Sequence, residues 1–165
     1  MGKEAWHIRR GVGSFLTMEF GEPGREIREP VAVRPGTPPR IRRALSRRQV
    51  TIHGEWHLWI DQAAWCIEQR DETLAESESS DELIDEAAKQ LDGQRLTAIS
   101  RKSERQTTTF EFDLGGKLTT WARASKGSLW MLRPRSGDCF ALKADGKVHS
   151  GPVDPAHKDW HWLRR

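Results

Sequence analysis

VTIHGEWHLWIDQAAWCIEQ, residues 50–69, is the stretch of this 165-residue chain from which the fold is best argued. Apolar side chains fall on alternate positions in its first half: Val50, Ile52, Trp56, Leu58 and Ile60. A period of two predicts a strand with one buried face and one solvent-facing face. Gly54 interrupts the alternation, and a glycine inside a strand is typical of a bulge or a bend.

A second run, residues 63–69, continues the stretch. In it Trp65 and Ile67 face one way and Cys66 faces the other. We therefore expect two paired antiparallel strands joined by a tight turn near Asp61. The expected role of the tryptophans is packing in and around the core, because aromatic side chains supply much of the area that a domain buries.

The chain on either side of this stretch adds further strands. Residues 1–10 are polar, and we expect the first strand in residues 13–20, where one face is wholly apolar. Residues 106–113, QTTTFEFD, alternate cleanly, and Asp145-Gly146 is a dipeptide typical of hairpin turns. Strand signals recur at roughly ten-residue spacing through this C-terminal half, which favours an antiparallel meander.

One helix is predicted, at about residues 79–92. Ser79 can cap it, and Glu82 completes a capping box three residues later. Gly93 is placed to end it in the left-handed conformation. Apolar side chains share one face at helical spacing: Leu83, Ile84, Ala87, Ala88 and Leu91.

These elements predict an α+β fold. It is mostly antiparallel sheet with one main amphipathic helix packed on it, in a single domain over residues 1–165. The pattern leaves open whether the sheet stays open or closes into a barrel. Residues 34–48 form a Pro- and Arg-rich loop, and residues 151–165 form a C-terminal tail.

Composition narrows the setting of the protein. No apolar run approaches the length of a membrane span, and the N-terminus lacks the apolar stretch of a signal peptide. We therefore expect no membrane partner and a cytoplasmic location. Two cysteines, Cys66 and Cys139, are too few for a disulfide framework, so reduced thiols are expected.

The net charge of +3 hides a strong segregation of charge along the chain. Residues 1–50 carry eleven basic and five acidic residues, a balance of +6. Residues 61–92 carry two basic and eleven acidic residues, a balance of −9. Charge separated in this way is evidence about the kind of partner that the protein binds, and it does not indicate the fold.

The acidic segment has two interpretations. In one, its charges form the solvated outer face of the helix, where the helix dipole also favours acids in the first turns. In the other, they form a docking surface for a basic protein partner. The residues of this acidic surface are Glu76, Glu78, Asp81, Glu82, Asp85 and Glu86.

The basic segment 34–48 also has two interpretations. It is either a solvated loop between strands or an arm that contacts nucleic-acid phosphates. Its prolines argue against regular structure before Pro39, and a short helix can follow. The nucleic-acid contacts expected on the second interpretation are Arg40, Arg42, Arg43, Arg47 and Arg48.

No constellation in the sequence predicts a reaction. His53 and His57 are four residues apart, which on a straight strand separates them by about 13 Å, too far for one metal ion unless Gly54 bends the chain. Two ordinary histidines on a wet strand face are the simpler interpretation, and Cys66 is near them only in sequence. We therefore assign no catalytic residue, no metal site and no cofactor.

Five short segments carry a resemblance to a loosely defined set of small bacterial proteins. They are SFLTMEFG (14–21), GEWHLWI (54–60), SES (77–79), LDGQ (91–94) and FEFDLGG (110–116). The resemblance covers about two thirds of the chain and leaves out residues 34–48. Proteins of this kind often look like immunity or accessory partners in bacterial toxin and conflict systems.

Two functional hypotheses follow. The first is a non-enzymatic protein-binding module, such as an immunity protein that neutralises a basic toxin through the acidic surface. The second is a nucleic-acid-binding accessory protein that uses the basic segment 34–48. An enzyme with a site at His53, His57 and Cys66 ranks third.

Overall fold

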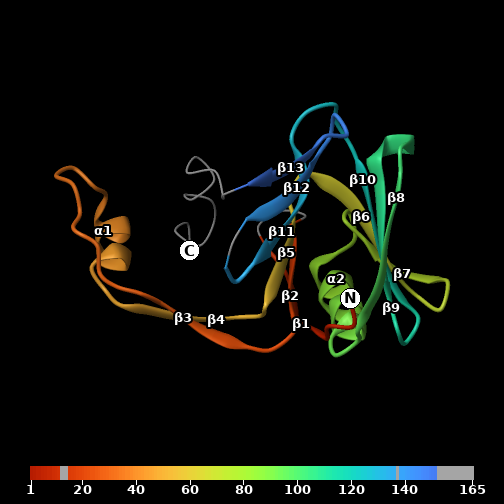
Figure 1. The fold of residues 1–165 in the computed structure, drawn as a ribbon, viewed down its shortest axis with the longest axis horizontal. Helices are drawn as coiled ribbons and strands as arrows, with labels where there is room; N and C mark the ends of the chain where they lie inside the picture. The colour runs from red at the N-terminus through yellow and green to blue at the C-terminus, as the bar shows by residue number, and fades with distance from the viewer. Residues whose placement is uncertain (12–14, 137, 152–165) are drawn as a thin grey trace.

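The computed structural model describes residues 1–11, 15–136 and 138–151 (Figure 1). Within them the chain forms two antiparallel sheets that face each other, a helix between their edges, and an arm that extends away from both. The prediction of an α+β fold dominated by antiparallel sheet with one main helix is confirmed. The tail expected at residues 151–165 lies outside the described residues, apart from Gly151.

The first sheet has six strands in the order β1-β2-β5-β11-β12-β13. It joins the N-terminal part of the chain, the centre of the 50–69 stretch and the C-terminal part. Its strands are β1 (Ala5–Arg10), β2 (Leu16–Phe20), β5 (Trp56–Ile60), β11 (Ser128–Pro134), β12 (Cys139–Lys143) and β13 (Val148–Gly151).

The second sheet has five strands in the order β7-β6-β10-β9-β8. The strand predicted within residues 106–113 is present, with Thr108, Phe110 and Phe112 buried on one face. A short 3₁₀ turn, η1 (Glu104–Gln106), leads into it. The strands are β6 (Ala63–Gln69), β7 (Glu72–Glu76), β8 (Leu96–Lys102), β9 (Thr107–Phe112) and β10 (Gly116–Ala122).

The predicted amphipathic helix is α2 (Asp81–Leu91). It contacts β1 of the first sheet and β6, β7 and β10 of the second, so it covers the gap between the two sheets (Figure 1). The N-cap is Ser80, one residue later than expected, and its hydroxyl accepts a hydrogen bond from the Leu83 amide at 3.4 Å. Gly93 follows the helix with a φ of +85°, as its sequence position predicts.

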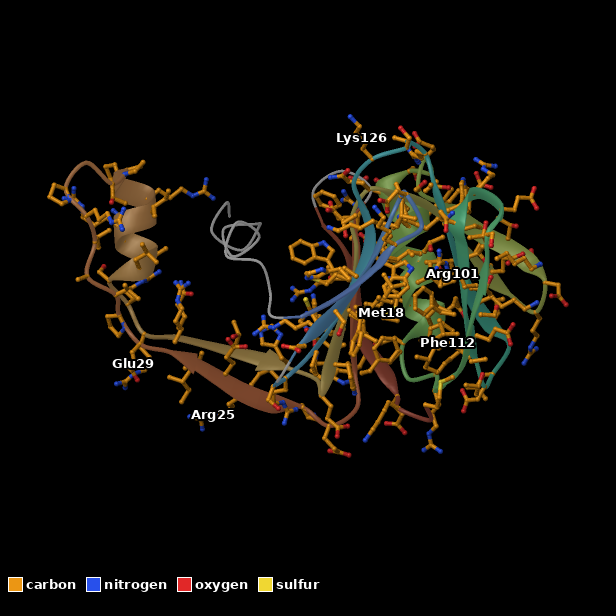
Figure 2. The ribbon with its side chains drawn as sticks, turned by 45° about the horizontal axis from the view of Figure 1, so that its top comes forward. Met18, Arg25, Glu29, Arg101, Phe112 and Lys126 are labelled. Carbon is orange, nitrogen blue, oxygen red and sulfur yellow. The ribbon has the colours of Figure 1, made fainter. Side chains whose placement is uncertain are left out.

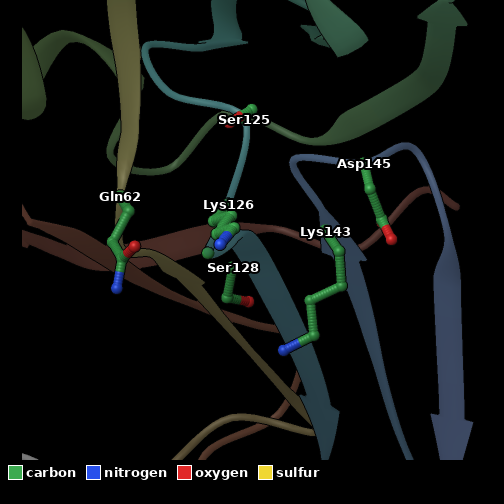
Figure 3. A pocket seen from close by; sticks show the side chains of 7 residues that line it. Gln62, Ser125, Lys126, Ser128, Lys143 and Asp145 are labelled. Carbon is green, nitrogen blue, oxygen red and sulfur yellow. The ribbon is translucent and has the colours of Figure 1, made fainter.

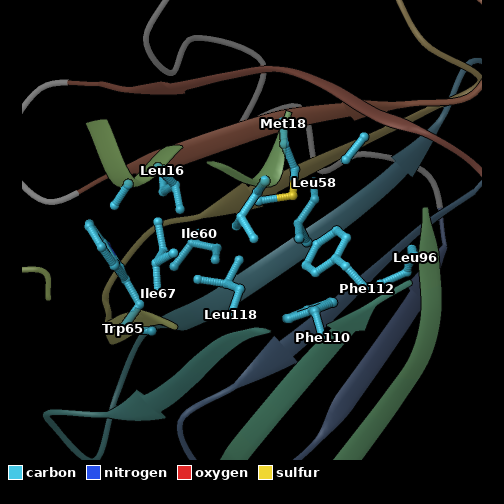
Figure 4. Packing of buried hydrophobic residues seen from close by; sticks show 14 of the residues in the cluster. Leu16, Met18, Leu58, Ile60, Trp65, Ile67, Leu96, Phe110, Phe112 and Leu118 are labelled. Atoms are coloured by element: carbon cyan, nitrogen blue, oxygen red, sulfur yellow. The ribbon is translucent and has the colours of Figure 1, made fainter. Parts of the chain in front are cut away.

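The hydrophobic core lies between the two sheets. Figure 4 shows side chains of β2 and β5, among them Met18 and Leu58, meeting Phe110 and Phe112 from the opposite sheet. Trp65 is fully buried there, so packing is the role of this tryptophan. The two sheets pack face to face as a β-sandwich. This packing buries the apolar face of each sheet, which neither sheet could do alone.

The hairpin expected around Asp61 is wrong. β5 and β6 are consecutive, but they belong to different sheets: β5 pairs with β2 and β11, and β6 pairs with β7 and β10. Residues 61 and 62 form a corner at which the chain crosses from one sheet to the other. Alternation identifies a strand but not its neighbour, because any strand of matching length can supply the ladder hydrogen bonds.

The polar N-terminus hides a strand. β1 is an edge strand that pairs with β2, with an irregular register between Trp6 and Arg9. Its side chains are mostly half-exposed, so they lack the apolar alternation by which a strand is recognised.

No helix of the described residues is long and apolar enough to cross a bilayer.

The segment predicted as a loop at residues 34–48 belongs to a projecting arm, which we define as residues 24–53. A two-stranded ribbon, β3 (Gly24–Arg28) and β4 (Gln49–His53), carries a short helix, α1 (Pro39–Leu45), beyond its far end. No residue of α1 is buried. Figure 2 shows Arg25 and Glu29 of the arm well away from Met18 and Phe112 of the body.

Candidate functional site

A carboxylate and an imidazole face each other across two strands at the root of the arm. Glu19 of β2 lies directly opposite His57 of β5 in the antiparallel register, as Met18 lies opposite Leu58. Met18 and Leu58 point into the core, so Glu19 and His57 share the outer face of the sheet. Directly opposed residues of neighbouring strands have side chains close enough to interact.

Gly54 brings a third side chain to this pair. β4 ends at His53 and β5 begins at Trp56, so the strand expected over residues 50–60 is broken at the glycine. A Cβ atom at Gly54 would lie 2.5 Å from the carbonyl oxygen of Phe20, which only glycine avoids. The bend turns the His53 ring toward His57, with 6.0 Å between the ring centroids.

Both imidazoles contact the same carboxylate oxygen. Nδ1 of His53 is 3.0 Å and Nδ1 of His57 is 2.8 Å from Oε1 of Glu19. The other oxygen, Oε2, accepts a hydrogen bond from the Gly54 amide at 2.9 Å. We call Glu19, His53 and His57 the Glu–His cluster.

Glu19 is held ionised although it is only 3% exposed. Burial by itself would raise the pKa of this carboxyl group. The hydrogen bonds from His53 and His57, and the Gly54 amide, act in the opposite direction and lower the pKa well below its ordinary value. The cluster is therefore a buried negative charge with two half-buried imidazoles against it.

Charged side chains of the arm and the body surround the cluster. Oε2 of Glu26, on β3, is 3.8 Å from Nε2 of His53 and 3.7 Å from Nη2 of Arg133, on β11. Arg135 donates from Nη2 to the carbonyl oxygens of Glu22 and His53. These contacts connect the base of the arm to the first sheet.

The cluster has the donor atoms of a metal site. Two imidazole nitrogens and one carboxylate oxygen lie within 4.8 Å of one another. Cys66 does not join them: it lies on β6 in the other sheet, with its sulfur 4.0 Å from the Thr73 hydroxyl. Burial raises the pKa of the Cys66 thiol, which disfavours the thiolate that a nucleophile or metal ligand needs.

The five arginines expected to contact nucleic acid lie in the arm. All five side chains are exposed, in α1 or between α1 and β4: Arg40, Arg42, Arg43, Arg47 and Arg48. The structure pairs Arg48 with Glu29 at 2.9 Å, and both side chains are well exposed. Ion pairs of this kind are weak and leave the guanidinium available to a stronger partner.

The six residues of the acidic surface follow one another along the chain: Glu76 ends β7, Glu78 lies in the turn after it, and the other four lie on α2. All are exposed. Three are ion-paired within the chain, Glu78 with Arg123, Asp81 with Arg10, and Glu86 with Lys89. Among the described residues the other three have no ion pair: Glu76, Glu82 and Asp85.

A separate open hollow of about 570 Å³ lies at one end of the first sheet (Figure 3). The described residues that line it include no histidine or cysteine; they are Gln62, Ser125, Lys126, Gly127, Ser128, Lys143 and Asp145. Asp61, next to Gln62, is only 7% exposed. Burial raises the pKa of Asp61 to about 6, and the charge of Lys143 acts against this rise.

Sequence reasoning missed Glu19 and Asp61 as residues of interest. Glu19 lies on the face of its strand opposite the apolar one, and its partners are 34 and 38 residues away. The only signal was a carboxylate on a strand whose other face is wholly apolar.

The sequence matches no protein-family model, and comparison with curated proteins and with solved structures finds no match either.

Proposed function

We propose that this protein binds nucleic acid through its arm, the second of the two hypotheses raised by the sequence. One observation carries the proposal: the arm extends away from the body with a basic surface that stays exposed among the described residues. Residues 24–53 hold eight arginines and two glutamates, a balance of +6. A two-stranded ribbon by itself is marginally stable in water, so we expect the arm to be stabilised by contact with a binding partner.

The shape of the arm suits a duplex groove. The major groove of B-DNA is about 12 Å wide and admits a helix or a two-stranded ribbon. One face of the ribbon is exposed and apolar with Arg25 among its residues, Ile27 being 46% and Val50 54% exposed. Apolar side chains of this kind contact base edges or thymine methyl groups, while arginines contact the phosphates.

The test is a fluorescence-anisotropy titration with a labelled duplex of about 20 base pairs at several salt concentrations. The variant replaces the five expected contacts, Arg40, Arg42, Arg43, Arg47 and Arg48, with glutamine. We expect at least a tenfold loss of affinity at low salt. The slope of the logarithm of the binding constant against the logarithm of salt concentration should fall by about 4.5, because each of the five phosphate contacts contributes about 0.9.

The matched control removes the same charge from the body of the protein. It replaces five exposed basic residues with glutamine: Arg70, Lys102, Arg105, Lys126 and Lys147. A general charge effect would weaken both variants equally and would contradict a role for the arm. Failure of the wild-type protein to bind the duplex at low salt would remove the proposal altogether.

A second candidate function is binding of a basic protein, such as a toxin, through the acidic surface. Leu83 favours it, because this side chain is 54% exposed on α2 among acidic residues. An apolar anchor with a charged rim is a common arrangement at protein interfaces.

Affinity capture from a bacterial lysate tests this second function. The variant reverses the three acids that have no ion pair within the described residues, in the form Glu76→Lys, Glu82→Lys and Asp85→Lys. We expect the wild-type protein to retain a basic protein in stoichiometric amount and the variant to lose it. Unfolding curves serve as the control, since exposed substitutions should leave stability nearly unchanged.

A further inference from the structure

The Glu–His cluster has the composition and the spacing of a metal centre. Two histidines and one carboxylate supply the ligands of many zinc and non-haem iron sites, with open positions left for water or substrate. We propose that Glu19, His53 and His57 bind a divalent transition-metal ion, with Zn²⁺ as the best-fitting ion. These three side chains are not among the arginines expected to contact nucleic acid, so the metal site and nucleic-acid binding can be tested separately.

The distances suit a four-coordinate ion. With metal–ligand bonds of about 2.0–2.1 Å, tetrahedral ligand atoms are about 3.4 Å apart. The two Nδ1 atoms are 3.0 and 2.8 Å from Oε1 of Glu19, and all three lie within 4.8 Å of one another. Small rotations of two half-buried rings bring the three atoms around one point.

The protons of the imidazoles have a place to go. In the structure each Nδ1 lies at hydrogen-bonding distance from a carboxylate oxygen, which a neutral ring satisfies by carrying its proton there. Metal binding needs the Nδ1 lone pair, so the proton moves to Nε2 of the same ring. For His53 that atom lies 3.8 Å from Oε2 of Glu26, which is beyond hydrogen-bonding distance. A shift of the Glu26 side chain by less than about 1 Å would let this carboxylate orient the metal-bound ring, as carboxylates do at many metal sites.

The charge balance also favours a cation. The Glu19 carboxyl group is buried, and Glu26 adds a second carboxyl group beside His53. Arg133 approaches Glu26 to 3.7 Å and offsets part of this charge, but it does not reach Glu19 by any contact of the described residues. A divalent ion would neutralise the two carboxylates.

An ion at this place would join the arm to the body. His53 is the last residue of β4 in the arm, whereas Glu19 and His57 lie on β2 and β5 of the first sheet. Coordination by all three would fix the angle at which the ribbon leaves the sheet. The site would therefore set the orientation of the surface that the arm presents.

The test uses the full-length protein freed of metal with a chelator. Calorimetric titration with Zn²⁺ should give one bound ion per chain, and Co²⁺ should give the visible absorption bands of a nitrogen- and oxygen-ligated ion. At a hundredfold excess over the dissociation constant, Zn²⁺ should raise Tm by roughly 5–10 °C. His53→Ala and His57→Ala should each weaken binding at least tenfold.

His149→Ala is the matched control, because His149 is exposed on β13 and makes no part of the cluster. His53→Gln is the second variant, since glutamine can still donate to Glu19 and so keeps the fold if alanine does not. Circular dichroism identifies a variant that fails to fold. Wild-type protein that takes up neither ion at micromolar concentration, or alanine variants that bind as tightly as the control, would overturn the site. Neither result depends on nucleic acid.

Discussion

Glu19→Ala should lower the free energy of unfolding of the metal-free protein by about 3 kcal/mol at pH 7. The substitution removes the acceptor for Nδ1 of His53, Nδ1 of His57 and the Gly54 amide. A buried donor left without an acceptor costs about 1–3 kcal/mol, and partial access of water to the two rings keeps the total near the lower end of the sum. Urea unfolding followed by tryptophan fluorescence, in the presence of a chelator, measures the loss.

The effect should depend on pH with a definite sign. The folded protein holds the pKa of Glu19 below its ordinary value of 4.5, so the folded state binds the proton more weakly than the unfolded state. The contribution of Glu19 is therefore present above about pH 4.5 and is lost as the pH falls below it. The difference between wild type and variant should shrink over the same range.

Glu29→Ala is the control for this prediction. This substitution also removes an ion pair, the one between Glu29 and Arg48, but both of these side chains are more than half exposed. An exposed pair is worth at most about 1 kcal/mol, so this variant should be nearly as stable as the wild type. A Glu19→Ala loss no larger than that of Glu29→Ala would show that the cluster contributes nothing to stability.

Asp61→Asn should act in the opposite direction and stabilise the protein by about 2 kcal/mol at pH 8. Asp61 is buried at the corner between the sheets, and its Oδ2 has no hydrogen-bond partner among the described residues. Its pKa of about 6 in the folded protein lies above the ordinary 3.8. Folding at high pH therefore carries the cost of burying an ionised carboxylate, which asparagine avoids.

The sign again sets the pH window. A carboxyl group with a raised pKa favours the folded state while it is protonated and loses that contribution as the pH rises from 3.8 through about 6. The gain from Asp61→Asn should thus appear at pH 8 and be small at pH 4. Asp85→Asn, an exposed change on α2, is the control. A gain that is equal at both pH values would contradict the assignment.

Much of the fold follows from local patterns. The alternation in residues 106–113 predicts β9 with its buried face, because side chains of a strand must point to alternate sides. The helical spacing from Leu83 to Leu91 predicts α2 because burial of one stripe is what stabilises a short helix. Leu83 itself is the exception, exposed at the edge of that stripe.

The candidate site could be anticipated only in part. The spacing of His53 and His57 and the bend at Gly54 are legible in the sequence, and together they state the condition under which the two rings meet. The carboxylate that joins them is not legible, because Glu19 reaches them through the pairing of β2 with β5. The projection of the arm could not be predicted from the sequence either, because an Arg- and Pro-rich composition is common to surface loops and to projecting arms.

The sequence by itself determined several of the strands, among them β2, β5, β6 and β9, where the main helix lies and which face of these elements is apolar. These properties depend on consecutive side chains and on the backbone geometry they favour. Only the tertiary structure decided that β5 and β6 belong to different sheets, that the ribbon leaves the body, and that Glu19 lies between two histidines. Those features depend on strand order and register, which are set by how two whole apolar faces fit together and by no single segment.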